Sequence, residues 1–258
     1  MKRIYLGIAV LGLLLLGGCN KVPKNTVFSI DDLTGKKIGV QLETTGDAYA
    51  TDIEGAEVVR FNKGEDAVNA LAEGKIDAVI LDEGPAVVFK EQNDSLRILD
   101  EAFAEEEYAL AVKKGNQELL DKINEALRTI KENGVLAEIF EGWIYNGEKT
   151  GVYQGQDKDS YANGTLVMAT NAEFPPYESK DGEDIIGIDV DIMKAICDEL
   201  DMKLEVENIA FDSIIAALDR GNADVGAAAM SVTDERKELA DFSDTYTTAI
   251  QVVIVRKD

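Results

Sequence analysis

Short apolar stretches alternate with helical patterns along most of this chain, and that alternation limits the fold more than any other feature. Strands are expected at residues 37–41, 58–61 and 76–81, with helices beginning at residue 44 and covering residues 65–73 between them. Strands that alternate with helices build α/β units around a largely parallel sheet. The sequence therefore predicts an α/β fold.

The same alternation restarts after a polar stretch. Residues 147–164 are rich in Gly, Asp, Lys and Ser and have no periodicity, so we expect a linker there. Beyond it come further expected elements, which are strands at residues 165–170, 203–207, 223–228 and 251–255 and helices at residues 187–200, 211–220 and 233–239. Two sets of α/β elements separated by a linker favour two lobes over one continuous sheet.

One local pattern occurs in both sets and supports that division. Each copy reads as a helix end, a Gly stop and an Asp that opens a buried strand. The two copies are Leu71, Gly74 and Asp77, then Leu218, Gly221 and Asp224.

The segment between the two sets reads as one strand followed by helices. Residues 106–113 are apolar-rich and are expected to form a single strand. Apolar residues then recur at helical spacing over residues 119–130, and Asn133 and Gly134 end that helix before a second one runs to about residue 145. Trp143 is expected in the core.

The first residues read as an export signal. Lys2 and Arg3 precede an apolar run over residues 4–16, which is short for a membrane span and typical of a signal peptide. The run ends in LGGC at Cys19 and resembles the bacterial lipobox. We expect a lipoprotein signal peptide at residues 1–18 and a lipidated Cys19 with a tether over residues 19–30. An ordinary cleaved signal and a short anchor helix are the alternatives. Cys197 lies in a helical pattern and is expected as a buried thiol.

Composition excludes several kinds of site. The chain has 26 Lys and Arg against 50 Asp and Glu, for a formal net charge of −24, so no nucleic-acid surface is expected. It has no His, which removes Ser-His and Cys-His catalysis and His-bound metals. We expect no cofactor, no metal and no catalytic residues.

Several segments together resemble the polar amino-acid substrate-binding proteins of ABC importers, solute-binding protein family 3. They are LTGKKIGVQ (33–41), TTGD (44–47), DAVILD (77–82), ATNAEFPPY (169–177), GIDVD (187–191), SVTDER (231–236) and DFSD (241–244). The resemblance covers most of the chain after the signal. It implies a two-lobed fold like that of the type II periplasmic binding proteins, with a ligand held between the lobes.

The order of these segments differs from the family, in which the segments at residues 169–244 come first. The chain therefore looks like a circular permutant, and a rearranged or misassembled gene fragment is the alternative. We expect a smaller lobe at 31–107, a hinge strand and helices at 108–146, and a larger lobe at 165–258 that ends in the second hinge strand. Only the first hinge strand is then expected to connect the lobes without a break.

The resemblance also implies which residues meet an amino acid. Arg236 matches the carboxylate-binding Arg, since a guanidinium can hold a carboxylate bidentately. Asp82 matches the ammonium-binding Asp. Ser231 lies just before Arg236, where a helix begins and its free N–H groups favour an anion. Thr44 and Thr45 precede a helix of the other lobe and match positions that complete the carboxylate site.

Five further residues would surround the ligand side chain. Phe174 and Phe211 match the aromatic pair that sandwiches it, while Asn171, Gln41 and the carbonyl of Ala229 would meet its distal end. Asn171 favours a neutral polar side chain. Glu43 would favour a cation if it points inward and is a surface acid if it points outward.

We therefore expect a monomeric, lipid-anchored binding protein on the extracytoplasmic face of the cell membrane. It would capture a polar amino acid by lobe closure and deliver it to an ABC importer permease. An amino-acid sensor for a membrane receptor is one alternative, and an enzyme on the same fold is another.

Overall fold

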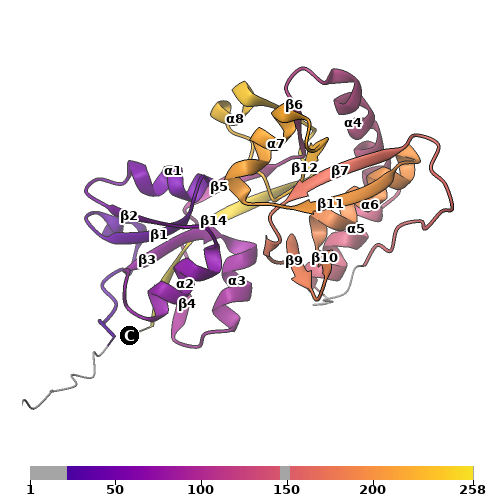
Figure 1. The fold of residues 1–258 in the computed structure, drawn as a ribbon. Coiled ribbons are helices and arrows are strands. Elements are labelled where there is room, and N and C mark those ends of the chain that lie inside the picture. Colours follow the sequence, from indigo (N-terminus) through magenta and orange to yellow (C-terminus); the bar gives the residue numbers. More distant parts are fainter. Residues whose placement is uncertain (1–21, 146–151, 258) are drawn as a thin grey trace, which may run out of the picture.

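The computed structural model describes residues 22–145 and 152–257, which form two lobes joined by extended strands (Figure 1). We call residues 27–108 and 247–256 the smaller lobe, and residues 109–246 the larger lobe. No helix within the described residues is both long and apolar enough to cross a membrane.

The smaller lobe is built on a mostly parallel sheet. Its elements are η1 (Ile30–Leu33), β1 (Lys37–Gln41), α1 (Thr45–Asp52), β2 (Glu57–Phe61), α2 (Gly64–Ala72), β3 (Ala78–Asp82), α3 (Glu83–Glu91), β4 (Leu96–Ile98), β5 (Ala104–Tyr108) and β14 (Thr247–Arg256). The strand order is β2-β1-β3-β14-β4, and β5 pairs with β14. β1, β2 and β3 are parallel, whereas β14 is antiparallel to β3, β4 and β5.

The larger lobe repeats this design on a second sheet. Its elements are β6 (Ala111–Lys113), α4 (Gln117–Glu132), α5 (Val135–Phe140), the π-helical turn η2 (Glu141–Tyr145), β7 (Thr165–Thr170), β8 (Glu173–Phe174), β9 (Glu178–Asp181), β10 (Asp184–Ile186), α6 (Ile188–Leu200), β11 (Lys203–Asn208), η3 (Phe211–Ser213), α7 (Ile214–Arg220), β12 (Val225–Gly226), α8 (Asp234–Leu239) and β13 (Ala240–Phe242). The main sheet has the order β11-β7-β12-β6-β13, and β8, β9 and β10 form a small antiparallel sheet beside it. The buried Cys197 and Trp143 lie in the largest core cluster, as predicted.

The repeated Leu, Gly and Asp pattern forms the same local structure in both lobes. Gly74 and Gly221 have φ values of +70° or more, in the left-handed region that lets a helix end there. Each following Asp accepts a main-chain N–H from the neighbouring strand, Asp77 from Lys37 at 3.0 Å and Asp224 from Val167 at 2.8 Å. The sequence pattern therefore predicts the same local structure in both lobes, in which a Gly ends a helix and an Asp connects the next strand to its neighbour.

The chain crosses between the lobes twice without a break, so the expectation of a single continuous crossing is wrong. The predicted strand at 106–113 is two strands, because β5 pairs with β14 in the smaller lobe while β6 pairs with β12 in the larger lobe. The second crossing runs through residues 243–246 into β14. The predicted range of the larger lobe, 165–258, is therefore too long, since residues 247–256 hydrogen-bond within the smaller lobe's sheet.

The linker residues that the structure describes, 152–164, have no helix or strand but are fastened to α6. Asp191 accepts two of their main-chain N–H groups, at 2.9 and 3.2 Å. Asp198 accepts a tyrosine hydroxyl and a further main-chain N–H, and Lys158 pairs with Asp201 at 2.7 Å. The linker therefore packs along α6.

The N-terminal segment is also packed on the smaller lobe. Asn25 and Val27 are buried, and Val27 joins the core cluster of that lobe. At the end of β14, Arg256 donates to the carbonyls of Pro23 and Leu71, at 3.1 and 3.0 Å. Cys19 and the predicted signal peptide lie outside the described residues.

Candidate ligand-binding site

One pocket between the lobes is lined by all ten residues that the sequence suggested for a ligand. They come from both lobes and are Gln41, Thr44, Thr45, Asp82, Asn171, Phe174, Phe211, Ala229, Ser231 and Arg236. Glu178 and Ala228 also line it. In an α/β sheet, ligands bind beyond the carboxyl ends of the parallel strands, and these residues follow or end such strands.

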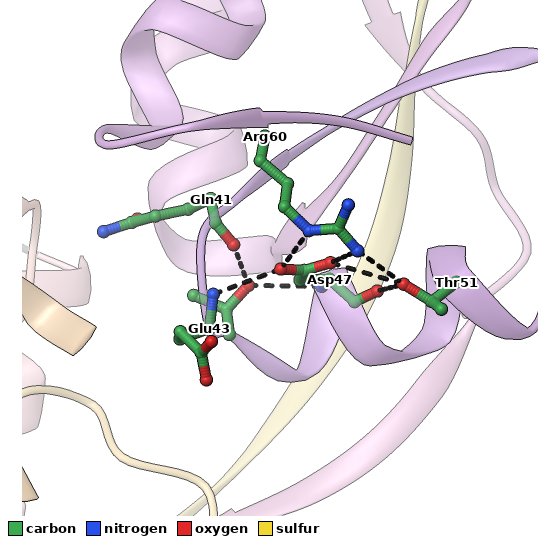
Figure 2. Close-up of polar contacts among 6 residues, drawn as sticks. Gln41, Glu43, Asp47, Thr51 and Arg60 are labelled. Atoms are coloured by element: carbon green, nitrogen blue, oxygen red, sulfur yellow. Dashed lines mark hydrogen bonds and ion pairs between the residues drawn. The ribbon is translucent and has the colours of Figure 1, made fainter. Parts of the chain in front are cut away.

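The beginning of α1 is held in place by a polar cluster (Figure 2). Thr44 caps the helix by accepting the N–H of Asp47, and its hydroxyl donates to the main-chain carbonyl of Gln41 at 2.8 Å. Asp47 in turn pairs with Arg60 at 2.8 Å and accepts the N–H of Glu43. Figure 2 shows the side chain of Gln41 pointing away from this cluster. The cluster therefore fixes the helix start beside the pocket and leaves Gln41 available to the cleft.

Arg236 spans the cleft from α8. Its two Nη atoms donate to the carbonyls of Ser231 at 2.8 Å and Glu43 at 2.9 Å, which belong to different lobes. The guanidinium also lies over the ring of Phe211, with Cζ 5.3 Å from the ring centroid. Burial lowers the pKa of Arg236, and the negative charges of nearby acids oppose that shift. A half-buried guanidinium with five N–H donors is suited to an anionic group.

Asp82 ends β3 and is nearly fully buried. Its Oδ1 accepts the hydroxyl of Tyr108 from the crossing strand β5. Burial raises the pKa of Asp82 to about 6, and the charge of Glu106 adds to this, while the Tyr108 hydrogen bond opposes it. A cation placed beside this carboxyl would stabilise its ionised form.

Two amides join the lobes at the other side of the pocket. The Nε2 of Gln41 donates to Oδ1 of Asn171 at 3.1 Å, and Nδ2 of Asn171 donates to the carbonyl of Ile209. A surface ion pair, Lys63 to Glu173 at 2.8 Å, makes a third contact between the lobes. Gln41 and Asn171, which the sequence assigned to the ligand, are therefore hydrogen-bonded to each other across the lobes.

Glu178 is the pocket residue that sequence reasoning missed. It is 1% exposed, and neither of its carboxyl oxygens has a hydrogen-bond partner among the described residues. Burial and the nearby Asp189 raise the pKa of Glu178 well above its usual range. Asp189 accepts the N–H of Ala229 and the hydroxyl of Tyr246, at 2.7 and 2.8 Å, and burial raises its pKa to about 6. Burial and the neighbouring Asp189 therefore both favour the protonated form of Glu178.

Glu43 takes the outward of its two predicted orientations. Its side chain is exposed and lines an outer groove of the cleft, not the pocket. Its backbone is left-handed at φ 62°, which brings its carbonyl to Arg236. Any preference for a cation would therefore have to come from another residue.

Comparison with known proteins agrees with this geometry. The sequence profile of the bacterial extracellular solute-binding proteins, family 3, matches residues 77–146 and 166–258, which is more than half of the chain. The chain belongs to this family. The two-lobed α/β fold of this solute-binding protein is accordingly that of the type II periplasmic binding proteins, as the sequence predicted.

Individual relatives of this solute-binding protein match over shorter stretches. It is 39% identical over 93 residues to the arginine-binding extracellular protein ArtP of Bacillus subtilis, covering 36% of each chain. It is 33% identical over 123 residues to the L-cystine-binding protein TcyJ of Escherichia coli, covering 47% of this chain and 46% of that protein. The solved structure of an ancestral arginine-binding protein bound to glutamine shares 46% identity, with 31% of this chain and 36% of that chain covered and a TM-score of 0.31. The chain thus spans less than half the length of the curated relatives it matches.

Proposed function

We propose that this protein captures a polar amino acid between its lobes and delivers it to an ABC-type importer. The observation that carries the proposal is the convergence of all ten suggested residues on one pocket between the lobes. An amino acid has a carboxylate and an ammonium, and burying either without a partner is costly. Arg236 and Asp82 offer a half-buried cation and a buried carboxyl in that pocket.

The side chain of the ligand would lie against Phe174 and Phe211, towards Glu178. A neutral Glu178 can donate a hydrogen bond, and an ionised one can pair with a cation. The named relatives bind arginine and cystine, which are both polar. Glu178 therefore favours a cationic or hydrogen-bond-accepting side chain over an apolar one.

Capture requires that the lobes close on the ligand. The contacts of Gln41 with Asn171 and of Arg236 with the Glu43 carbonyl link the lobes in this structure. Closure by such contacts is a shift towards a conformation that the ligand stabilises. The proposed anchor is a lipid on Cys19, which would keep the protein beside its permease as a monomer.

We also propose that the chain is a natural circular permutant of its family. The family match falls in two segments on either side of the linker. Arg256 donates to the carbonyl of Pro23 at 3.1 Å, so a short connection would restore the usual chain order. The described linker residues are fastened to α6, which fits an established junction better than an accidental fusion.

The test is calorimetric titration of residues 20–258 with each common amino acid. We expect one polar amino acid to bind, and Arg236→Lys to weaken its affinity by about 10- to 100-fold, because bidentate and charged hydrogen bonds are lost. Arg220→Lys is the matched control, since Arg220 is exposed at the end of α7. No binding of any amino acid by a folded protein, or equal affinities for the two Lys variants, would contradict the proposal.

A further inference from the structure

Glu106 lies where the two lobes and both crossing strands meet. It is on β5, next to the first crossing, and is 8% exposed. Its Oε2 accepts hydrogen bonds from Oγ1 of Thr45 at 3.0 Å, Oγ of Ser231 at 2.7 Å and Nε2 of Gln251 at 3.1 Å. Thr45 belongs to the smaller lobe, Ser231 to the larger lobe, and Gln251 to the second crossing strand, β14.

The two hydroxyls cannot serve Glu106 and a ligand at the same time. An ionised carboxylate only accepts hydrogen bonds, and each hydroxyl has a single proton to donate. Thr45 and Ser231 therefore give their protons to Glu106 and not to the pocket. A ligand carboxylate would be left with the guanidinium of Arg236 and main-chain N–H groups.

One of these bonds depends on the distance between the lobes. Glu106 and Thr45 belong to the smaller lobe, whereas Ser231 belongs to the larger lobe and forms an isolated β-bridge with Tyr108, the last residue of β5. If the lobes separated, the Ser231 hydroxyl would leave the shared oxygen and Thr45 would stay with Glu106. Hydrogen bonds to an ionised group are stronger than those between neutral groups. A bond that breaks on opening therefore shifts the equilibrium towards the closed form.

We propose that Glu106 is a positioning residue that bridges the lobes when no ligand is bound. Its carboxylate holds Thr45 of the smaller lobe and Ser231 of the larger lobe together and populates the closed conformation in advance of the amino acid. The inference rests on the proposed lobe closure and adds a residue that does not line the pocket.

The experiment is small-angle X-ray scattering of ligand-free protein, residues 20–258, with variants at three positions. Glu106→Ala should lower the ratio of closed to open molecules by about tenfold, the size expected for losing a hydrogen bond to a charged group. Glu106→Gln keeps an acceptor oxygen and should fall between Ala and wild type. Ser231→Ala should produce the same shift from the opposite lobe, and its effect should not add to that of Glu106→Ala. Glu105→Ala is the matched control, because Glu105 is exposed on the same strand.

A merely structural role would lower the melting temperature of these variants without changing the scattering of their folded, ligand-free form. Equal ligand-free profiles for wild type, Glu106→Ala and Glu106→Gln would therefore overturn the inference. That comparison needs no ligand. If no amino acid altered the wild-type profile, the proposed capture by closure would fail separately, and the ligand-free comparison would still decide the role of Glu106.

Discussion

Replacing Glu178 by Gln should make the protein more stable at neutral pH but not at acidic pH. Burial and Asp189 raise the pKa of Glu178 far above its value in the unfolded chain, about 4.5. The folded protein thus keeps a proton that the unfolded chain releases as the pH rises. The stability that this proton provides is complete below pH 4.5 and declines as the pH rises towards the pKa of the folded state. Gln resembles the protonated side chain and does not titrate.

The size of the effect follows from proton linkage. Between the unfolded and folded pKa values, one extra bound proton lowers the free energy of unfolding by about 1.4 kcal/mol per pH unit. Relative to Glu178→Gln, the wild type should therefore lose up to about 3 kcal/mol between pH 5 and pH 7. Asp189 and Asp82 both raise the pKa of Glu178, so the difference measures the titration of these coupled carboxyl groups and not of Glu178 alone.

The assay is urea unfolding of ligand-free protein at pH 5, 6, 7 and 8. Glu183→Gln is the matched control, because Glu183 is exposed in the turn between β9 and β10. A Glu178→Gln difference that is the same at pH 5 and pH 7 would refute the reasoning, since it would mean that Glu178 is ionised in the folded protein over that range.

Two further predictions concern the ends of the chain. Cys19→Ala should move the protein from the membrane fraction to the soluble fraction of producing cells, whereas Cys197→Ala, which changes a buried thiol, should leave it in the membrane fraction. Retention of the Cys19 variant in membranes would argue against the lipid anchor. A chain with residues 165–258 placed before residues 22–146 should fold and bind the same amino acid as the original order, measured by calorimetry. Loss of binding from a cooperatively folded reordered chain would count against the permutation.

The strands and helices on both sides of the linker were predictable because their apolar periodicity is strong. The site residues were predicted from the resemblance to the family, not from periodicity. Their positions fit the fold, because most of them follow strands or begin helices, and in a parallel arrangement those ends gather at one edge. Gln41, Asp82 and Asn171 are separated by long stretches of sequence, but each lies at or just after the end of a strand.

Three features could not be read from periodicity. The apolar run at 106–113 does not mark the point where the chain leaves one sheet for the other, because both halves of the run are buried. α3 contains Gly84 and Pro85, which resemble a turn, although Pro is tolerated in the first turn of a helix. Glu178 begins the polar stretch ESKDGED, which is typical of an exposed hairpin, but the packing of β9 against β8 and α6 buries it.

The hydrogen bond from Arg256 to the Pro23 carbonyl determines where a force on the N-terminal segment would act. Tension on the N-terminal segment would enter the folded body at the last residue of β14. The strand carries Gln251, which contacts the Glu106 cluster, five residues earlier and about 17 Å away along the strand. Arg256 also holds the carbonyls of Leu71 and Ile76, so the load spreads into the α2 end of the smaller lobe. A force on the N-terminal segment would therefore strain the end of the smaller lobe that contains Arg256. It would leave the geometry of the cleft unchanged.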